Sequence, residues 1–276
     1  MKILIAGANG LLGASIVPLL AERFDLWVHD VDSWDITCGP AGEELVCRYR
    51  PDVVLNLAAM TDVDGCEGAS ELAEKVNAQG AAIVADLCGK AGTKLIHVST
   101  DYVFDGKKGL PYCEDDEPNP ASVYGRTKLE GERMVFEKLP SAVVIRTQWL
   151  YGKTGASFVE KIIRAAGEQG SVRVVNDQTG SPTYAKDLAV PIMAVIEKGL
   201  TGIVHVSNSG SCTWYEFARA IFSLKGMDVE VSPITTRELG RAAPRPPYSV
   251  FDLSRLERDT GVRMRHWMEA LKEYLA

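Results

Sequence analysis

The sequence predicts an α/β fold in which a doubly wound parallel sheet carries a smaller C-terminal cap. Short apolar runs alternate with helical stretches through the first half of the chain, which is the pattern of repeated βαβ units. The first turn, at residues 7–10, is rich in glycine and opens a helix, as such folds require. The chain has 276 residues, of which 46% are hydrophobic, so a large core is expected.

The strands of this sheet are predicted near residues 2–6, 25–30, 52–57, 94–99 and 141–147. The crossovers between them are predicted to be helices with an apolar face at helical spacing, at Leu11–Glu22, Glu43–Tyr49, Ala69–Cys88 and Ser122–Lys138. Ligands in such sheets bind beyond the carboxyl ends of the strands. We therefore expect the chemistry in loops 7–10, 30–37, 58–66 and 100–121.

After about residue 150 the pattern loosens into pieces punctuated by Gly and Pro, with a strand-like run at Ile203–Val206 and a final amphipathic helix around Trp267–Leu275. We expect residues 1–150, with a return segment near 184–206, to form the sheet domain, and residues 151–276 mainly to form the cap. The stretch Arg241–Ser249 contains three prolines, which prevent helix or central strand, so it is predicted to be an ordered loop or a lid.

Charge and composition exclude several classes of partner. The chain has 30 Lys and Arg against 37 Asp and Glu, and the net charge of -7 argues against binding of nucleic acid. No basic leader precedes the first strand, and no segment approaches the roughly 20 apolar residues that span a bilayer, so a cytoplasmic protein without a membrane anchor is expected. The six cysteines form no CxxC pair, so we expect reduced thiols and no metal site.

The first turn has the spacing GxxGxxG, formed by Gly7, Gly10 and Gly13. In a dinucleotide-binding turn the first glycine allows the tight bend, the second lets the backbone approach the pyrophosphate, and the third lets the helix lie close to the sheet. The alternative is a βα turn whose glycines serve steric needs alone. Asp30 favours the cofactor interpretation, because an acid at the end of the second strand can accept from the adenosine ribose hydroxyls.

Asp30 also predicts which cofactor is used, NADH or NADPH. The residues after it, Val31, Asp32 and Ser33, supply no Arg or Lys for a 2′-phosphate. On charge alone, Asp30 favours NADH over NADPH. The alternative is that Asp30 only caps a loop.

Tyr124 and Lys128 stand at i and i+4 of a predicted helix, so both project from one face. Such pairs also occur on solvated helices, but this pair follows the fourth strand, whose end carries Ser99 and Thr100. Reduction of a ketone by hydride leaves an alkoxide that needs a proton. Tyr124 can donate it, and Lys128 can lower the phenol pKa and hold the nicotinamide ribose. Thr100 can orient the carbonyl, while strand alternation turns Ser99 to the other face.

These motifs together resemble the extended short-chain dehydrogenase/reductases, and within them the dTDP-4-dehydrorhamnose reductase family. The resemblance covers nearly the whole chain. It is carried by GxxGxxG, by NLAA at Asn56–Ala59, by STDYVFDG at Ser99–Gly106, by YGRTK at Tyr124–Lys128, by RTQWLYG at Arg146–Gly152, by NDQTGSPT at Asn176–Thr183 and by RPPYS at Arg245–Ser249. It implies a Rossmann-like fold and reduction of the C4 ketone of dTDP-4-dehydro-L-rhamnose by NAD(P)H, with Tyr124, Lys128 and Thr100 as catalytic residues.

The resemblance also implies binding residues at the matching positions. Those expected at the cofactor are Gly7, Gly10, Leu11, Leu12, Gly13, Asp30, Asp35, Ile36, Ala58, Ala59, Met60, Tyr124 and Lys128. Those expected at the sugar nucleotide are Thr100, Asp101, Tyr124, Trp149, Gln178, Thr183 and Arg245. Arg245 is placed there because an arginine can clamp a diphosphate with two hydrogen bonds. The alternatives are a buried aromatic for Trp149, turn residues for Gln178 and Thr183, and a solvated charge for Arg245.

Three positions depart from the family pattern, and a fourth matches the wider family. Gln148 stands where the family usually has a small Ser, and Met60 replaces a residue that is often polar, so both bear on substrate identity. Ser15 replaces a glutamate that joins a metal-bridged dimer in some relatives, so no metal is expected, although a homodimer is. Asn77 matches the structural asparagine of the wider family.

Two other functions remain open from the sequence. A nucleotide-sugar epimerase or dehydratase shares the cofactor turn and the Tyr/Lys pair but retains its bound NAD. A regulatory subunit resembling methionine adenosyltransferase subunit beta shares the scaffold but serves by binding a partner enzyme. The intact Thr100, Tyr124 and Lys128 favour the enzyme.

Overall fold

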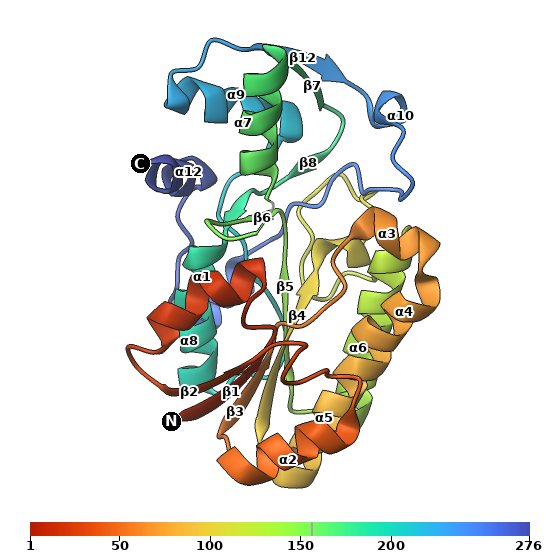
Figure 1. Ribbon diagram of the computed structural model, residues 1–276, viewed down its shortest axis with the longest axis vertical. Helices are drawn as coiled ribbons and strands as arrows, with labels where there is room; N and C mark the ends of the chain where they lie inside the picture. Colours follow the sequence, from red (N-terminus) through yellow and green to blue (C-terminus); the bar gives the residue numbers. More distant parts are fainter. Residues whose placement is uncertain (156) are drawn as a thin grey trace.

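A twisted parallel sheet forms the centre of the molecule (Figure 1). The computed structural model describes residues 1–155 and 157–276. Within them the sheet has six strands in the order β10-β5-β4-β3-β1-β2, and every neighbouring pair is parallel. The strands are β1 (Lys2–Ala6), β2 (Asp25–His29), β3 (Val53–Asn56), β4 (Lys94–Thr100), β5 (Val143–Thr147) and β10 (Gly202–His205). The fold is the Rossmann-like, doubly wound α/β fold that the sequence predicts.

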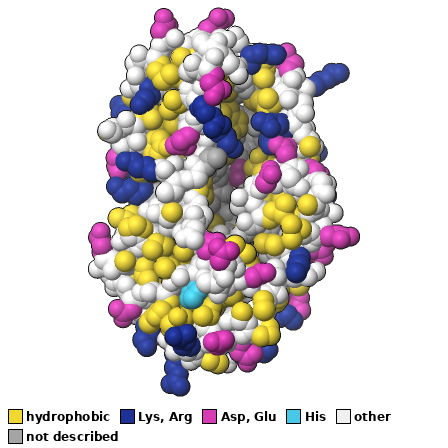
Figure 2. All heavy atoms as spheres, in the orientation of Figure 1, with side chains coloured by type: hydrophobic (Ala, Val, Ile, Leu, Met, Phe, Trp, Pro, Cys, Tyr) yellow, Lys and Arg dark blue, Asp and Glu magenta, His cyan; other side chains and the backbone are white. Residues whose placement is uncertain are grey.

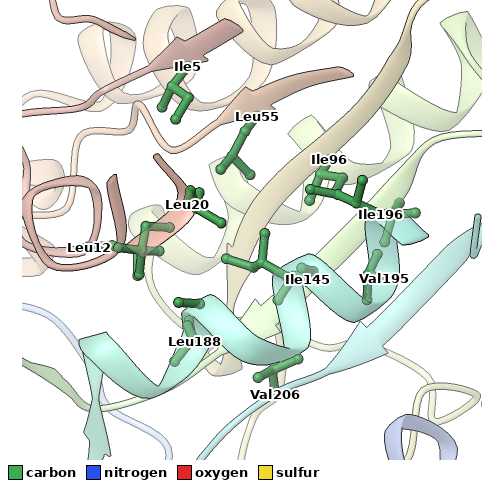
Figure 3. Close-up of a cluster of buried hydrophobic side chains, with 14 of the residues drawn as sticks. Ile5, Leu12, Leu20, Leu55, Ile96, Ile145, Leu188, Val195, Ile196 and Val206 are labelled. Carbon is green, nitrogen blue, oxygen red and sulfur yellow. The ribbon is translucent and has the colours of Figure 1, made fainter. Parts of the chain in front are cut away.

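Helices cover both faces of this sheet. One face packs on α1 (Leu11–Leu20) and α8 (Ala189–Lys198) through a cluster of aliphatic side chains that α8 and the strands share (Figure 3). The other face packs on α2 (Gly39–Tyr49), α5 (Ala81–Ala91) and α6 (Val123–Lys138). Strands buried on both sides explain why β1 and β3 read as unbroken apolar runs.

A separate hydrophobic cluster holds the cap together at the opposite end of the molecule from α2 (Figure 1). Its main elements are α7 (Phe158–Gln169), β7 (Ser171–Val175), α9 (Trp214–Lys225), β12 (Glu230–Ile234) and α12 (Trp267–Leu275). The short elements are α3 (Val63–Gly68), α4 (Ser70–Glu74), η1 (Lys75–Gly80), η2 (Asp101–Val103), β6 (Leu150–Tyr151), β8 (Thr179–Gly180), β9 (Thr183–Tyr184), η3 (Ala185–Leu188), β11 (Cys212–Thr213), α10 (Thr236–Leu239) and α11 (Ser254–Thr260). No helix of the described chain is long and apolar enough to cross a bilayer.

The predicted elements of the sheet domain are confirmed to within a few residues at most ends, and Ile203–Val206 corresponds to β10. The stretch predicted as a helix at Ala69–Cys88 is helical from Ser70 on, but a π-helical turn, η1, interrupts the α-helix between α4 and α5. This turn carries Asn77, whose side chain accepts a hydrogen bond from Met60 N at 2.8 Å and donates to Met60 O at 3.1 Å. A wide turn of this kind is common near functional sites.

The cap is more regular than the sequence predicts. The glycines that break its pattern mark the ends of helices: Gly170 and Gly226 follow α7 and α9 in the left-handed conformation. Arg241–Ser249 forms a loop without helix or strand, apart from one bridge at Tyr248.

Candidate active site

The glycine turn after β1 is shaped by close backbone contacts. Gly7 has φ 80°, and a Cβ there would lie 2.7 Å from Ala58 N. A Cβ at Gly13 would lie 2.5 Å from the carbonyl oxygens of Gly7 and Ala8. Gly10 is the N-cap residue of α1, and no side chain accepts a hydrogen bond from the free N–H groups of this helix end. A Cβ at Gly10 would meet only the oxygen of Gly7, at 3.4 Å. An uncapped helix N-terminus beside open space fits the pyrophosphate of a dinucleotide.

This turn opens into a cavity of about 430 Å³ that also contains the candidate catalytic residues. The cavity lies at the carboxyl ends of β1, β3, β4 and β5, where ligands bind in doubly wound sheets. The face of the molecule drawn in Figure 2 is hollowed near its centre, and acidic and basic side chains are mixed on it. Predicted residues that line the cavity are Gly7, Gly10, Leu11, Leu12, Gly13, Ala59, Thr100, Asp101, Tyr124, Lys128 and Trp149.

Tyr124 and Thr100 both line this cavity, and the Thr100 hydroxyl donates to Asp101 Oδ1 at 3.1 Å. Tyr124 lies in the first turn of α6, which Ser122 caps by accepting a hydrogen bond from Gly125 N at 3.1 Å. Thr100 ends β4. Burial raises the pKa of the Tyr124 phenol above its ordinary value, and the Thr100 hydroxyl lowers it in part. The phenol is therefore protonated at neutral pH, as a proton donor must be.

Lys128 is buried one helical turn beyond Tyr124 and points toward β4. Its Nζ donates to Val98 O at 2.7 Å and lies 3.2 Å from His97 Nε2. Burial lowers the pKa of Lys128 to about 8, opposed by the carboxylate of Glu132. The lowering of the Tyr124 pKa by Lys128 that the sequence predicts is not found, since the ammonium group is turned toward these strand atoms.

The neighbouring hydroxyl, Ser99, is occupied by a structural contact. Its Oγ donates to Glu132 Oε1 at 2.5 Å, and the other carboxylate oxygen pairs with Arg146 Nη2 at 2.6 Å. Both charged side chains are at most 3% exposed. Ser99 thus anchors β4 to α6, whereas Thr100 faces Tyr124.

Three residues that line the cavity carry buried polar atoms with no hydrogen-bond partner among the described residues. These atoms are Asp101 Oδ2, Thr147 Oγ1 and Gln148 Nε2. Burial also raises the pKa of Asp101 to about 6. Unpaired buried polar atoms are costly, so their presence at this cavity fits a ligand rich in hydroxyl groups. Gln148, the departure from the family pattern, is held by Ser181 N, which donates to its Oε1 at 2.9 Å.

Trp149 forms one wall of the cavity with Trp214 of α9. Their rings are stacked with centroids 3.6 Å apart and planes 6° apart. Trp149 has φ 46°, a left-handed conformation that is rare for a large side chain and is found chiefly at functional sites. Gln178 lies behind this pair, where its Oε1 accepts from Trp214 Nε1 at 3.2 Å. A Cβ at Gly180 would meet the Trp149 ring at 2.4 Å, so glycine is required there.

The remaining predicted residues lie outside the cavity lining: Asp30, Asp35, Ile36, Ala58, Met60, Gln178, Thr183 and Arg245. Ile36 packs in the core beneath α2 and α5. Thr183 is buried and donates to Ser181 O at 2.9 Å. Asp35 Oδ1 accepts from Thr37 N at 2.9 Å. Asp30 holds the glycine turn, because its carboxylate accepts from Asn9 N and from Val31 N, each at 2.8 Å.

Arg245 forms a two-bonded ion pair with Asp64 of α3. Its Nη1 and Nη2 lie 3.1 and 2.8 Å from the two carboxylate oxygens, and Ala243 N donates to the same carboxylate at 3.0 Å. These contacts fasten the proline-rich loop to α3. The predicted contact of Arg245 with a diphosphate would require Asp64 to share this guanidinium.

Several lining residues were not predicted from the sequence. They are Leu57, Thr61, Val63, Val98, Ser99, Tyr102, Thr147, Gln148, Leu150, Ser157, Phe158 and Trp214. Phe158 and Trp214 begin the cap helices α7 and α9. The capping box at Thr213 and Glu216 marks the start of α9 in the sequence and would have placed Trp214 at a helix N-terminus.

The fold and this site define an NAD(P)H-dependent oxidoreductase of the extended short-chain dehydrogenase/reductase class. The model of a family described as RmlD substrate binding domain matches residues 1–276. The chain belongs to the dTDP-4-dehydrorhamnose reductase family.

Relatives of this family match over most of their length. The chain is 42% identical to dTDP-4-dehydrorhamnose reductase of Mycobacterium tuberculosis, covering 100% of this chain and 92% of that protein. It is 43% identical to a probable dTDP-4,6-dihydroxy-2-methyloxan-3-one 4-ketoreductase of Streptomyces antibioticus, covering 99% and 94%. The crystal structure of the Bacillus anthracis dTDP-4-dehydrorhamnose reductase in complex with NADP is 42% identical with a TM-score of 0.96, covering 99% and 98% of the two chains.

Proposed function

We propose that this protein reduces the C4 ketone of dTDP-4-dehydro-L-rhamnose to the alcohol of dTDP-L-rhamnose, using NADH or NADPH. The observation that carries the proposal is that Thr100 and Tyr124 line one cavity, which is bounded by the glycine turn and by residues of the cap. A protonated phenol and a neighbouring hydroxyl suit the protonation of a developing alkoxide. The relatives named as reductases of dTDP-linked keto sugars support the substrate class.

In this proposal each residue has one task. The glycine turn and the N-terminus of α1 hold the pyrophosphate, and the bound cofactor supplies the hydride. Thr100 orients the carbonyl oxygen, Tyr124 donates its phenolic proton to that oxygen, and Lys128 holds the nicotinamide ribose. Asp101 and Gln148 supply an acceptor and a donor for sugar hydroxyls, and Trp149 packs against the sugar nucleotide.

The division of the chain stays a prediction that the packing supports. Residues 1–150, with the return segment 184–206, would bind the cofactor, and residues 151–276 mainly the substrate. Helix α8 and β10 belong to the return segment, and their side chains share a cluster with β1 and β3. A homodimer and a cytoplasmic location also stay predictions.

A substrate panel tests the proposed function. Oxidation of NADH and of NADPH is followed separately with dTDP-, GDP- and UDP-linked 4-keto sugars. We expect the highest kcat/KM with a dTDP-linked 4-keto-6-deoxy sugar. Tightly bound NAD without net cofactor oxidation would favour an epimerase or dehydratase. Recovery of a stoichiometric synthetase in a pull-down, with no ketone reduction, would favour the regulatory subunit.

Cofactor preference gives a prediction about Asp30. Its carboxylate is fixed by Asn9 N and Val31 N at the end of β2, where it can accept from the ribose hydroxyls and repel a 2′-phosphate. We expect the wild type to prefer NADH, and Asp30→Asn to shrink or invert that preference. A hydrogen bond to a charged group contributes about 1.5–3 kcal/mol, so the ratio of kcat/KM values is expected to change by roughly tenfold or more.

The control for this prediction is Asp32→Asn, which removes the same charge from an exposed residue two positions away. Both variants are measured at one ionic strength, because salt screens exposed charges. A ratio unchanged by Asp30→Asn, or changed as much by Asp32→Asn, would mean that another group sets cofactor choice.

A further inference from the structure

A buried chain of hydrogen bonds reaches Lys128 from the turn that follows β3. Asn56 and His97 are paired residues of the neighbouring strands β3 and β4. Asn56 Nδ2 lies 3.2 Å from His97 Nδ1, and His97 Nε2 lies 3.2 Å from Lys128 Nζ. The three side chains are at most 1% exposed. Bulk water therefore does not compete for the hydrogen bonds between these three side chains.

The backbone of the β3 turn fixes the direction of these bonds. Ala58 N donates to Asn56 Oδ1 at 3.1 Å, which turns the amide nitrogen of Asn56 toward His97. The opposite orientation would leave the Ala58 N–H without this acceptor. The amide nitrogen can only donate, so His97 Nδ1 must accept. Burial and the nearby Lys128 hold the pKa of His97 well below its ordinary value, so the ring is neutral and carries its proton on Nε2.

The proton on His97 Nε2 points at Nζ of Lys128, 3.2 Å from the ring nitrogen. A neutral amine has a lone pair that can accept it, whereas an ammonium has none. The neutral amine can still donate to Val98 O, 2.7 Å away. If Lys128 were an ammonium in the same place, its N–H groups and the Nε2–H of His97 would face each other as two donors. His97 could avoid this only by moving its proton to Nδ1, where it would face the amide nitrogen of Asn56, which is also a donor.

We propose that His97 is a positioning residue: with Nδ1 held by Asn56, it presents an N–H to Lys128, favours the neutral amine and so sets the pH at which Lys128 changes charge. The inference rests on the proposed role of Lys128 in the same site. It assigns a function to two strand residues that neither line the cavity nor take part in the proposed proton transfer.

Other charged and titratable groups near this site lie on α6, β5 and η2. Glu132 follows one turn later on α6, and Arg146 of β5 pairs with its carboxylate. Tyr124 precedes by one turn, and Asp101 of η2 lines the same cavity. Glu132 favours the ammonium form of Lys128, although its carboxylate is already shared with Arg146 and Ser99. The contact with His97 acts in the opposite direction and favours the neutral amine of Lys128.

The first test reads the tautomer of His97 directly. The chain has four histidines, so a ¹⁵N-histidine NMR spectrum can be assigned with single substitutions. His205 is an internal control, because it is also buried but its Nδ1 lies 3.0 Å from Tyr112 O and must donate. We expect opposite tautomers at a pH above about 8, where Lys128 is neutral, with the proton on Nε2 of His97 and on Nδ1 of His205. A proton on Nδ1 of His97, or a charged ring, would overturn the inference.

The second test reverses the direction of the hydrogen bonds that link residue 56, His97 and Lys128. In Asn56→Asp, one oxygen can accept from Ala58 N and the other from a proton on His97 Nδ1, so the Nε2 lone pair turns to Lys128 and the ammonium is favoured. In His97→Gln, the amide oxygen can accept from the ammonium, with the same effect. We expect the pKa of Lys128, measured by NMR of ¹⁵N-labelled lysine and assigned with Lys128→Met, to rise by about one unit in both variants.

His205→Gln is the matched control and should leave the pKa of Lys128 in place. Ketone reduction offers a second readout, since its kcat/KM should fall at a higher pH when the pKa of Lys128 rises. Folded variants with an unchanged Lys128 pKa would show that His97 serves packing alone. Because NMR reads both the tautomer and the pKa, failure of this inference is distinguishable from absence of the proposed reductase activity.

Discussion

Substitution of Tyr124 by Phe is expected to lower turnover about 10²- to 10⁴-fold, the loss typical of a general acid. The phenol is buried, lines the same cavity as Thr100 and is kept protonated by its raised pKa. The Phe ring fills the same space between α6 and Tyr102, whose ring lies 5.4 Å away. Cofactor affinity should therefore stay nearly unchanged. The measurements are kcat for ketone reduction and the Kd of NADH from quenching of tryptophan fluorescence.

The control for Tyr124→Phe is Tyr112→Phe. Tyr112 is a buried tyrosine outside the cavity, and its hydroxyl accepts a hydrogen bond from Lys108 N at 3.2 Å. Its loss should cost about 1 kcal/mol of stability and leave turnover in place. Near-normal turnover in Tyr124→Phe would remove this residue from the mechanism.

Substitution of Glu132 by Leu is expected to lower the free energy of unfolding by about 3–5 kcal/mol. It leaves the guanidinium of Arg146, which is 1% exposed, without its carboxylate. Arg146 already has one unpartnered nitrogen, Nη1, and its other neighbours include the ring of Phe104, 5.1 Å from Cζ. Breaking a buried ion pair costs more than the pair contributes, because the remaining charge stays desolvated. Urea denaturation measures the change.

The double variant Glu132→Leu with Arg146→Met separates charge from packing. Replacement of both partners by apolar residues of similar size should recover most of the lost stability. The loss that remains should be about that of one hydrogen bond, because Ser99 no longer has an acceptor. A double variant as unstable as Glu132→Leu alone would contradict the electrostatic explanation.

The sequence predicts the sheet domain well because its signals are local. Parallel strands buried on both faces read as apolar runs, and Gly7 and Gly13 are required by backbone contacts that any such turn makes. Strand alternation also separates Ser99 from Thr100 correctly, since Ser99 turns to Glu132 and Thr100 to Tyr124. The π-turn before α5 has no local signal, because the contacts of Asn77 with Met60 that accompany it are tertiary.

The cap and the orientation of long side chains depend on contacts distant in sequence. Trp214 reaches the cavity through its stack on Trp149, 65 residues earlier in the chain. Arg245 is taken by Asp64, a residue of α3 that no pattern in the proline-rich loop reveals. Lys128 turns toward β4 because Val98 and His97 offer it partners there. Spacing predicts that such residues share a face, but not which partner each one finds.

The most direct test of the proposed function follows the hydride itself. The protein is incubated with dTDP-4-dehydro-L-rhamnose and NADH carrying deuterium at the transferred position of the nicotinamide C4, and the product is analysed by NMR. We expect one cofactor oxidised for each sugar reduced, with deuterium on C4 of the sugar. Conversion of the sugar without net cofactor oxidation and without deuterium at C4, or no conversion of any dTDP-linked 4-keto sugar, would contradict the account.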